Sequence, residues 1–284
     1  DNVKDLFRIA SDSVGMDIED LLFNSSEDDL KQTDKTQIAI TVVNLSAAIY
    51  LEERGIHGGG FAGFSLGEYS ALAKAGVISL EDVFPLVKAR GDIMEKVSKT
   101  LSKDGGPPGM AAVIGLSFDT VNSIIAEEGI EGLSVANYNS PNQIVLSGTS
   151  TGLDKGEPVM KKAGAKRYIR LKVSAPFHSP LLEPAKREFA EVLSQYSFHD
   201  PKDPVYSNVT AGRVSSGDEA KQLCIQQIVS TVRWVDEEEQ LLRDGFERCV
   251  EAGPGKVLTG LWKSVGGSVQ CLQAGTVEQI GTIQ

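Results

Sequence analysis

Residues 63–68 read Gly63-Phe64-Ser65-Leu66-Gly67-Glu68, and this Gly-x-Ser-x-Gly pattern predicts a sharp turn from a strand into a helix with the serine at its tip. We expect glycines on both sides of the turn because a side chain there would clash with the returning backbone. The turn itself requires a short strand over about 61–64, which the glycine-rich residues there do not predict by propensity. The residues after the turn predict a helix over 66–74 that ends at Gly76. The amides at the start of that helix would face any negative charge that develops beside Ser65. Alone, the pattern fits a catalytic serine and an ordinary glycine-rich turn equally well.

The composition narrows the class of protein. The chain has 284 residues, of which 41% are hydrophobic and 24% charged, enough for one large domain with an insertion. A net charge of −11 argues against nucleic acid or an anionic membrane as the main partner. No apolar run approaches the length of about 18 residues that a membrane-spanning helix needs. Cys224, Cys249 and Cys271 are odd in number and widely spaced, which favours free thiols in a reducing compartment over disulfides or a zinc site.

The order of predicted elements divides the chain into two parts. Outside residues 99–174, helices and strands alternate, which predicts an α/β domain with a mainly parallel sheet. Within 99–174 the order is βαββαβ, as in a ferredoxin-like unit. We therefore expect a small domain over 99–174 inserted into a large domain made of 1–98 and 175–284. The expected elements of the insertion are strands over 110–116, 133–138, 143–147 and 166–173, a helix over 118–128 and a weaker helix over 159–163.

The large domain is expected to contain several helices and three further strands. A helix from Asp34 to Gly55 is apolar nearly all round, which predicts that it is buried. Ser79 and Asp82 are expected to cap the next helix, and Asp218 to cap a later one that carries Gln227. The expected strands cover residues 205–209, 247–251 and 268–273.

A serine at a turn needs a base to take its proton before it can act as a nucleophile. His57 and His199 lie in polar or glycine-rich surroundings and are expected at the surface. His178 lies in the loop Pro176-Phe177-His178-Ser179-Pro180, where the insertion rejoins the large domain and where Ser179 and Pro180 begin a helix. A lone histidine of this kind is more often a buried, hydrogen-bonded residue, but together with Ser65 we favour a general base.

Arg90 lies near the centre of the predicted helix that follows Ser79. An arginine on a helix is usually solvated or salt-bridged. If its side chain pointed into the cleft instead, its planar fork would suit two-point binding of a carboxylate and would select an acidic substrate.

Four stretches together resemble the malonyl-CoA:acyl-carrier-protein transacylases of type II fatty acid synthesis. They occur in the order expected for that family and span nearly the whole chain: Gly63-Phe64-Ser65-Leu66-Gly67-Glu68-Tyr69-Ser70-Ala71-Leu72, Ala89-Arg90-Gly91, Ser174-Ala175-Pro176-Phe177-His178 and Glu251-Ala252-Gly253-Pro254-Gly255-Lys256-Val257-Leu258.

The resemblance implies a hydrolase-like α/β domain with a ferredoxin-like insertion, in agreement with the order of elements. It also implies a ping-pong acyltransferase that needs no metal or cofactor. Ser65 would attack malonyl-CoA, with His178 as general base and then general acid. Arg90 would hold the malonyl carboxylate, and the Leu66 amide would donate to the oxyanion. The main-chain carbonyl of Gln227 would orient His178, and Phe177 is typical of members that take malonyl groups.

The implied partners are malonyl-CoA and acyl carrier protein, with no nucleic acid and no membrane. We expect a monomer in the cytoplasm, or in an organelle stroma or matrix if the source is eukaryotic. Since the carrier protein is acidic too, docking would need a local basic patch, for which Lys161, Lys162, Lys166 and Arg167 are candidates; a solvated face is the more common meaning of such a cluster.

The chain departs from the family at two places. The family usually has histidine where this chain has Phe64, so we expect a tuned or slightly weakened site. Family members also begin with a strand and a Gly-Gln-Gly-Ser-Gln loop that supplies the second oxyanion amide, and nothing of that kind precedes Asp1. Losing one such donor typically costs ~10²–10³ in rate. We expect that the natural protein has an additional N-terminal segment.

Two other functions share parts of this pattern. A serine esterase or thioesterase of the α/β-hydrolase kind would have the same turn, but its histidine would lie near the C-terminus. A non-catalytic binder of carrier protein could also carry the fold. We rank both below the transferase because the chain retains Ser65, Arg90 and His178.

Overall fold

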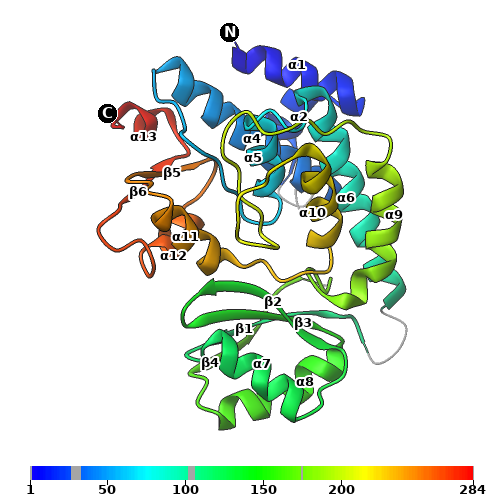
Figure 1. Ribbon diagram of the computed structural model, residues 1–284. Coiled ribbons are helices and arrows are strands. Elements are labelled where there is room, and N and C mark those ends of the chain that lie inside the picture. Colours follow the sequence, from blue (N-terminus) through cyan, green and yellow to red (C-terminus); the bar gives the residue numbers. More distant parts are fainter. Residues whose placement is uncertain (1, 27–32, 102–105, 174, 284) are drawn as a thin grey trace.

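The computed structural model describes residues 2–26, 33–101, 106–173 and 175–283. Figure 1 shows a larger, helix-rich part that holds both ends of the chain and a smaller unit with its own sheet, which has four strands. The helices of the larger part are α1 (Asn2–Val14), α2 (Ile18–Asn24), α4 (Thr33–Glu53), α5 (Gly67–Lys74), α6 (Leu80–Thr100), α9 (Glu183–Leu193), α10 (Gly217–Gln227), α11 (Trp234–Arg243), α12 (Val257–Trp262) and α13 (Val277–Gly281). None of the helices in the described ranges is both long and apolar enough to cross a bilayer.

The core of the larger part forms around α4, as its apolar pattern predicts. Ile38, Val42 and Leu45 are fully buried and belong to one cluster with Val83 and Leu86 of α6. A helix with apolar residues on every face is stable only where neighbours cover it on all sides. The cluster extends to α9 through Phe189, so the helices on either side of the small unit in sequence pack together.

The fold is α/β, and its parallel ladder lies near the C-terminus. Strand β5 (Cys249–Ala252) pairs in parallel with β6 (Cys271–Ala274), close to the strands expected over 247–251 and 268–273. The expected strands over 61–64 and 205–209 are much shorter than predicted: within the described residues they form one parallel bridge, Phe61 with Val205. Glycines 58–60 have no side chains to pack on a sheet, and the backbone turns away immediately after the bridge.

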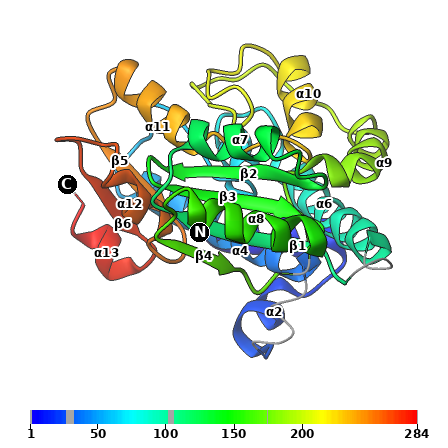
Figure 2. The same cartoon turned by 90° about the horizontal axis from the view of Figure 1, so that it is seen from below.

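The smaller unit has the βαββαβ order and the antiparallel sheet of a ferredoxin-like fold. Its strands pair in the order β2-β3-β1-β4, and all three pairings are antiparallel. Figure 2 shows both of its helices on the same face of this sheet. Its elements are β1 (Gly109–Ile114), α7 (Phe118–Glu127), β2 (Leu133–Ser140), β3 (Gln143–Gly148), α8 (Ser150–Lys162) and β4 (Arg167–Arg170).

Helix α8 is much longer than the predicted 159–163. Its start is fixed by Thr149, whose hydroxyl accepts a hydrogen bond from Gly152 N–H at 3.0 Å. The glycines that argued against a helix lie against β2: a Cβ added at Gly152 would come within 2.9 Å of the Gly132 carbonyl oxygen, and one at Gly156 within 2.8 Å of Leu133 Cδ2. They are present because the helix packs closely on the sheet, and this packing outweighs their low helix propensity.

Two predicted helix starts differ in the structure. Ser216, not Asp218, caps α10, because its hydroxyl accepts from Glu219 N–H while Asp218 lies in the first turn. Ser179 does act as a cap, but the turn that it starts is a 3₁₀ turn over Pro180–Leu182, and α9 begins after it. The Ser79 cap of α6 is confirmed by its bond from Asp82 N–H.

The smaller sheet is fastened to the larger part beside two functional segments. Val232, shortly after α10, exchanges backbone hydrogen bonds with Tyr138 and Ala136 of β2. Ser147 of β3 donates to the carbonyl of Phe177, in the loop before α9. The small unit therefore holds the segment after Gln227 and the loop that carries His178. The exact limits predicted for the two domains remain a prediction, since residues 102–105 and 174 lie outside the described ranges.

Candidate active site

Ser65 occupies the turn that its sequence predicts. Its φ is +50°, in the left-handed region that residues other than glycine rarely adopt. Gly67 N–H donates to Phe64 O at 2.9 Å, which closes the turn, and α5 follows at once. The helix ends as predicted: Gly76 has a φ of +75°, and Val77 N–H donates back to Leu72 O.

The two glycines of the pattern have different roles. A Cβ on Gly63 would overlap the backbone of Gly67 and Glu68, so this position excludes a side chain, as predicted. A Cβ on Gly67 would meet nothing within 4 Å. The expectation that both glycines prevent a clash is therefore wrong for Gly67, which faces open space.

The Ser65 hydroxyl lies against His178, 113 residues away in sequence. Ser65 Oγ is 2.7 Å from His178 Nε2, and His178 Nδ1 is 2.9 Å from the main-chain oxygen of Gln227. A carbonyl oxygen can only accept, so the proton of the neutral ring is on Nδ1, and Nε2 is free to accept from the serine. Burial, together with the positive charge of Arg90, lowers the pKa of His178 to about 4. The neutral form, which a general base requires, therefore prevails at neutral pH.

The His178 loop is held in an unusual backbone conformation. His178 has a φ of +56° and its side chain is buried. Ser179 donates its hydroxyl proton to Pro176 O at 2.9 Å, and Ser147 holds the Phe177 carbonyl. Short polar side chains thus fix the loop on both sides of the histidine. The other two histidines, His57 and His199, are exposed as expected and do not contact Ser65.

Arg90 points into the site rather than into solvent. It is buried in α6, and its Nη2 lies 3.1 Å from both Ser65 Oγ and Gln227 Oε1. Nη1 donates to Gln37 Oε1 at 3.0 Å, and the guanidinium lies over the Tyr69 ring. Within the described residues Arg90 forms no ion pair, since all its protein acceptors are neutral. Its charge is therefore available to a substrate carboxylate.

The backbone of Ser65 is held on both sides by side-chain amides that the sequence analysis did not identify in this role. Gln227 Nε2 donates to Ser65 O at 3.1 Å, and Asn208 Oδ1 accepts from Ser65 N–H at 2.6 Å. The Gln227 side-chain amide and the Asn208 backbone N–H both donate to Glu68, a buried carboxyl in the same motif as the serine. Burial raises the pKa of Glu68 to about 7. Glu68 could have been suspected from its place in the motif, whereas Asn208 has no sequence signal of its own.

Leu66 and Phe177 were predicted to contact the substrate, and these roles stay predictions; the surroundings of both residues and of Phe64 are as follows. The Leu66 N–H makes no hydrogen bond within the described residues, so it can donate to an oxyanion. Phe177 is half-buried at the junction and packs on Met110 and Val145 of the small sheet. Phe64 makes an edge-to-face contact with the buried Trp234, with ring centroids 5.5 Å apart. An apolar pair thus occupies the place where the family usually has a polar imidazole.

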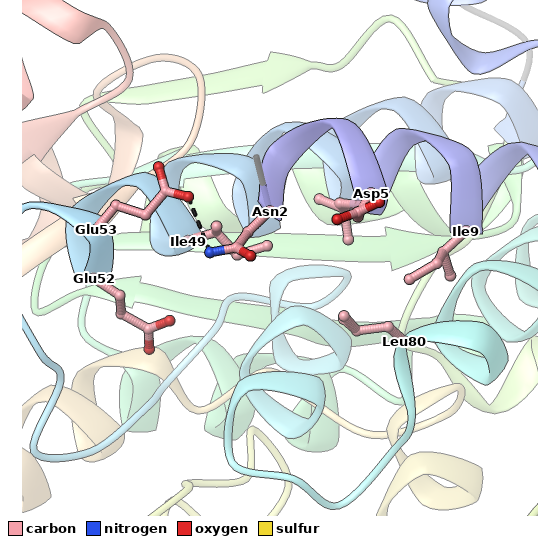
Figure 3. Close-up of a pocket in the computed structure, with 8 residues that line it drawn as sticks. Asn2, Asp5, Ile9, Ile49, Glu52, Glu53 and Leu80 are labelled. Carbon is pink, nitrogen blue, oxygen red and sulfur yellow. Dashed lines mark hydrogen bonds between the residues drawn. The ribbon is translucent and has the colours of Figure 1, made fainter.

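Two cavities do not include Ser65, His178 or Arg90. One of about 740 Å³ runs behind the turn, between residues 58–67 and β5, and includes Leu66 and Gly67 but not Ser65, His178 or Arg90. A second, of about 450 Å³, lies between α1 and the end of α4 (Figure 3). Its rim carries Asp5, Glu52 and Glu53, with Asn2 donating to Glu53 at 3.0 Å. It shares no residue with the constellation.

A hydroxyl nucleophile, a neutral imidazole and an unpaired guanidinium meet at one point, with a free amide beside them. This arrangement defines an enzyme of the serine–histidine acyl-transfer class, with an arginine suited to an acidic acyl group. The chain belongs to the acyl transferase domain family, whose model matches residues 2–280.

Individual relatives agree with this assignment. The chain is 34% identical over 279 residues to a malonyl CoA-acyl carrier protein transacylase of Bacillus subtilis. The matched region covers 98% of this chain and 86% of that relative. The chain is also 39% identical over 264 residues to the polyketide biosynthesis protein ThaF of Burkholderia thailandensis, covering 92% of this chain but only 22% of that protein.

Solved structures give the same result. An acyl carrier protein S-malonyltransferase of Vibrio cholerae superposes with a TM-score of 0.94 at 34% identity, covering 99% of this chain and 91% of the other. A malonyl transacylase solved with its type II polyketide acyl carrier protein superposes with a TM-score of 0.92 at 32% identity, covering 99% and 90%.

Proposed function

We propose that the protein transfers the malonyl group of malonyl-CoA to the phosphopantetheine thiol of acyl carrier protein, for fatty acid or polyketide synthesis. The observation that carries this proposal is the position of Ser65 Oγ, within hydrogen-bonding distance of both His178 Nε2 and Arg90 Nη2. A base on one side of the hydroxyl and an unpaired cation on the other fit a substrate whose acyl group ends in a carboxylate.

In the first half-reaction, Ser65 Oγ attacks the thioester carbonyl while His178 Nε2 takes its proton. The negative charge on the carbonyl oxygen is stabilised by the Leu66 amide at the start of α5. Collapse breaks the carbon–sulfur bond, His178 returns the proton to the leaving thiolate of CoA, and malonyl-serine remains. Arg90 holds the distal carboxylate through both steps.

In the second half-reaction the carrier-protein thiol replaces CoA. His178 removes the thiol proton, the sulfur attacks the malonyl-serine ester, and the proton passes to Ser65 Oγ as the carbon–oxygen bond breaks. The Gln227 carbonyl keeps Nδ1 protonated throughout, so that Nε2 alternates between acceptor and donor.

The wider setting follows from the relatives and from the chemistry of the site. The named transacylases and the complex with a carrier protein support malonyl-CoA and acyl carrier protein as partners. The residues supply nucleophile, base and positive charge, so the proposed reaction uses no metal or cofactor. Cys224, Cys249 and Cys271 are free thiols, which supports a reducing compartment such as the cytoplasm.

Intact-mass measurement after incubation with malonyl-CoA tests the nucleophile and the carboxylate clamp together. Wild-type protein should gain one malonyl group, and Ser65→Ala should gain none. Arg90→Ala should lose malonyl transfer by on the order of 10²-fold, with a much smaller loss of acetyl transfer, because the malonyl group carries a free carboxylate and the acetyl group does not.

Four results would contradict the proposal. Two are malonyl retained covalently on Ser65→Ala and equal losses of malonyl and acetyl transfer in Arg90→Ala. Free malonate as the product, instead of malonyl carrier protein, would indicate a thioesterase. Binding of carrier protein without any acyl-serine would indicate a non-catalytic binder.

A further inference from the structure

The backbone conformation of Ser65 is unfavourable by itself and must be stabilised by the surrounding residues. A φ of +50° at a residue with a side chain is unfavourable and persists only where neighbouring contacts enforce it. The Ser65 carbonyl accepts a hydrogen bond from Gln227, which also accepts hydrogen bonds from His178 and Arg90. The Ser65 amide is held by a different residue, Asn208, at 2.6 Å.

Asn208 is itself fixed by three donated hydrogen bonds. Its Nδ2 donates to Gly63 O at 2.8 Å and to Glu237 Oε2 at 2.9 Å, and its backbone N–H donates to Glu68 Oε2 at 3.2 Å. The two acceptors around Nδ2 determine which way the amide faces, because a flipped amide would oppose its NH₂ to the Ser65 N–H. Asn208 therefore spans the turn and joins its first residue, Gly63, to the serine.

Glu237 anchors this amide from α11. It is completely buried, and its second oxygen, Oε1, has no hydrogen-bond partner within the described residues. Burial, with a contribution from Glu68, raises the pKa of Glu237 well above its usual range. What Asn208 requires of Glu237 is an acceptor at a fixed position, which Oε2 supplies. A glutamine has an equivalent acceptor.

We propose that Asn208, anchored by Glu237, is a positioning residue that holds Ser65 in the conformation required for acyl transfer. This role depends on the proposed function only for the identity of the reaction that Ser65 carries out. Because Ser65 Oγ and the adjacent Leu66 N–H are carried by the same turn, the Asn208 bond aligns the hydroxyl with His178 and the amide with the oxyanion. Substrate does not need to touch Asn208 for its loss to slow the chemistry.

The experiment compares Asn208→Ala with wild type by the rate of malonyl-serine formation. A misplaced nucleophile costs on the order of 10²-fold in kcat, and KM for malonyl-CoA should change little because Arg90 is intact. The labelling rate of Ser65 by a fluorophosphonate should fall in parallel. This second readout does not depend on the acyl donor, so it still tests the positioning role if malonyl-CoA proves not to be the substrate.

Two further variants distinguish positioning from folding. Glu237→Gln should retain near wild-type kcat and labelling because it keeps the acceptor, whereas Glu237→Ala should lose both. Asn122→Ala, which removes an exposed asparagine from α7, is the matched control and should leave both rates unchanged.

The proposal is overturned if a folded Asn208→Ala keeps kcat and labelling within about threefold of wild type, a change of less than 1 kcal/mol in activation free energy. If Asn208→Ala does not fold, the Glu237 pair decides. Loss in Glu237→Ala with recovery in Glu237→Gln supports the proposal, and equal rates in the two variants overturn it.

Discussion

At the residue scale, His178 and Arg90 both contact the Ser65 hydroxyl, so the charge of Arg90 acts on the pKa of His178 at short range. Arg90 places a positive charge beside an imidazole that burial already keeps neutral. A substrate carboxylate bound to Arg90 would offset that charge and make His178 a better proton acceptor. The base would therefore be strengthened when an acidic acyl group is bound, which favours malonyl over acetyl groups in addition to direct binding.

The low pKa of His178 predicts an unusual acid limb in the pH profile. An ordinary histidine, with a pKa near 6.5, would lose its base form below pH 6.5. Here the pKa in the free enzyme is about 4, so kcat/KM for malonyl-CoA should stay nearly constant from pH 7.5 down to about 5. Stopped-flow acylation across this range measures it. An acid limb at pH 6.5 in kcat/KM would show that His178 is not kept neutral as the structure indicates.

Some residues of the site could be predicted from the sequence, and others could not because their contacts leave no signal in it. Ser65, His178 and Arg90 could be proposed because each has a reactive side chain and a recognisable local pattern. Asn208 and Glu237 act through hydrogen bonds to a backbone 143 residues away or to each other, and such contacts leave no periodic or motif signal. The structural placement of Gln227 matches its expected contact with His178, but its side-chain bonds to Arg90, Ser65 and Glu68 could not be read from the sequence.

At the element scale, prediction succeeded where hydrophobic pattern and packing agree. The strands β1, β2 and β3 carry strong apolar runs and lie within two residues of their expected limits. Helix α8 was underestimated because its glycines were read by propensity alone, although they are required for close packing on β2. The strand before Ser65 was overestimated because the turn demanded a strand that the glycine-rich segment barely forms.

The surroundings of two helical glycines predict that alanine substitutions there will have opposite effects on stability. Gly152→Ala should destabilise the protein by about 1–3 kcal/mol, because its methyl group would press on the Gly132 and Glu131 carbonyls, which belong to backbone that cannot easily move. A methyl group at Gly260 in α12 would have no atom within 4 Å, so Gly260→Ala should stabilise the protein by up to about 1 kcal/mol. Urea unfolding of both variants measures this, and a Gly152→Ala protein as stable as wild type would contradict the close contact.

At the scale of the whole molecule, charge limits how the proposed partner can dock. The protein has a net charge of −11, and an acidic carrier protein would be repelled unless it met a local basic surface. Lys161, Lys162, Lys166 and Arg167 are exposed around the end of α8 and the start of β4, in the small unit that also holds the His178 loop. Lys161 is partly neutralised by Glu157, at 2.6 Å, so Lys162 and Arg167 should contribute more to docking.

Reversing the charge of Lys161 and Lys162 should therefore affect one substrate and not the other. KM for carrier protein should rise several-fold, and the effect should shrink as salt is raised, because exposed charges are screened beyond about 10 Å at 0.1 M ionic strength. KM for malonyl-CoA should stay constant, since Arg90 and Ser65 are untouched. The matched control reverses Lys4 and Lys263, which are also exposed and change the net charge equally. Equal effects of both double variants would attribute docking to overall charge, and no effect of either would remove the patch from the docking surface.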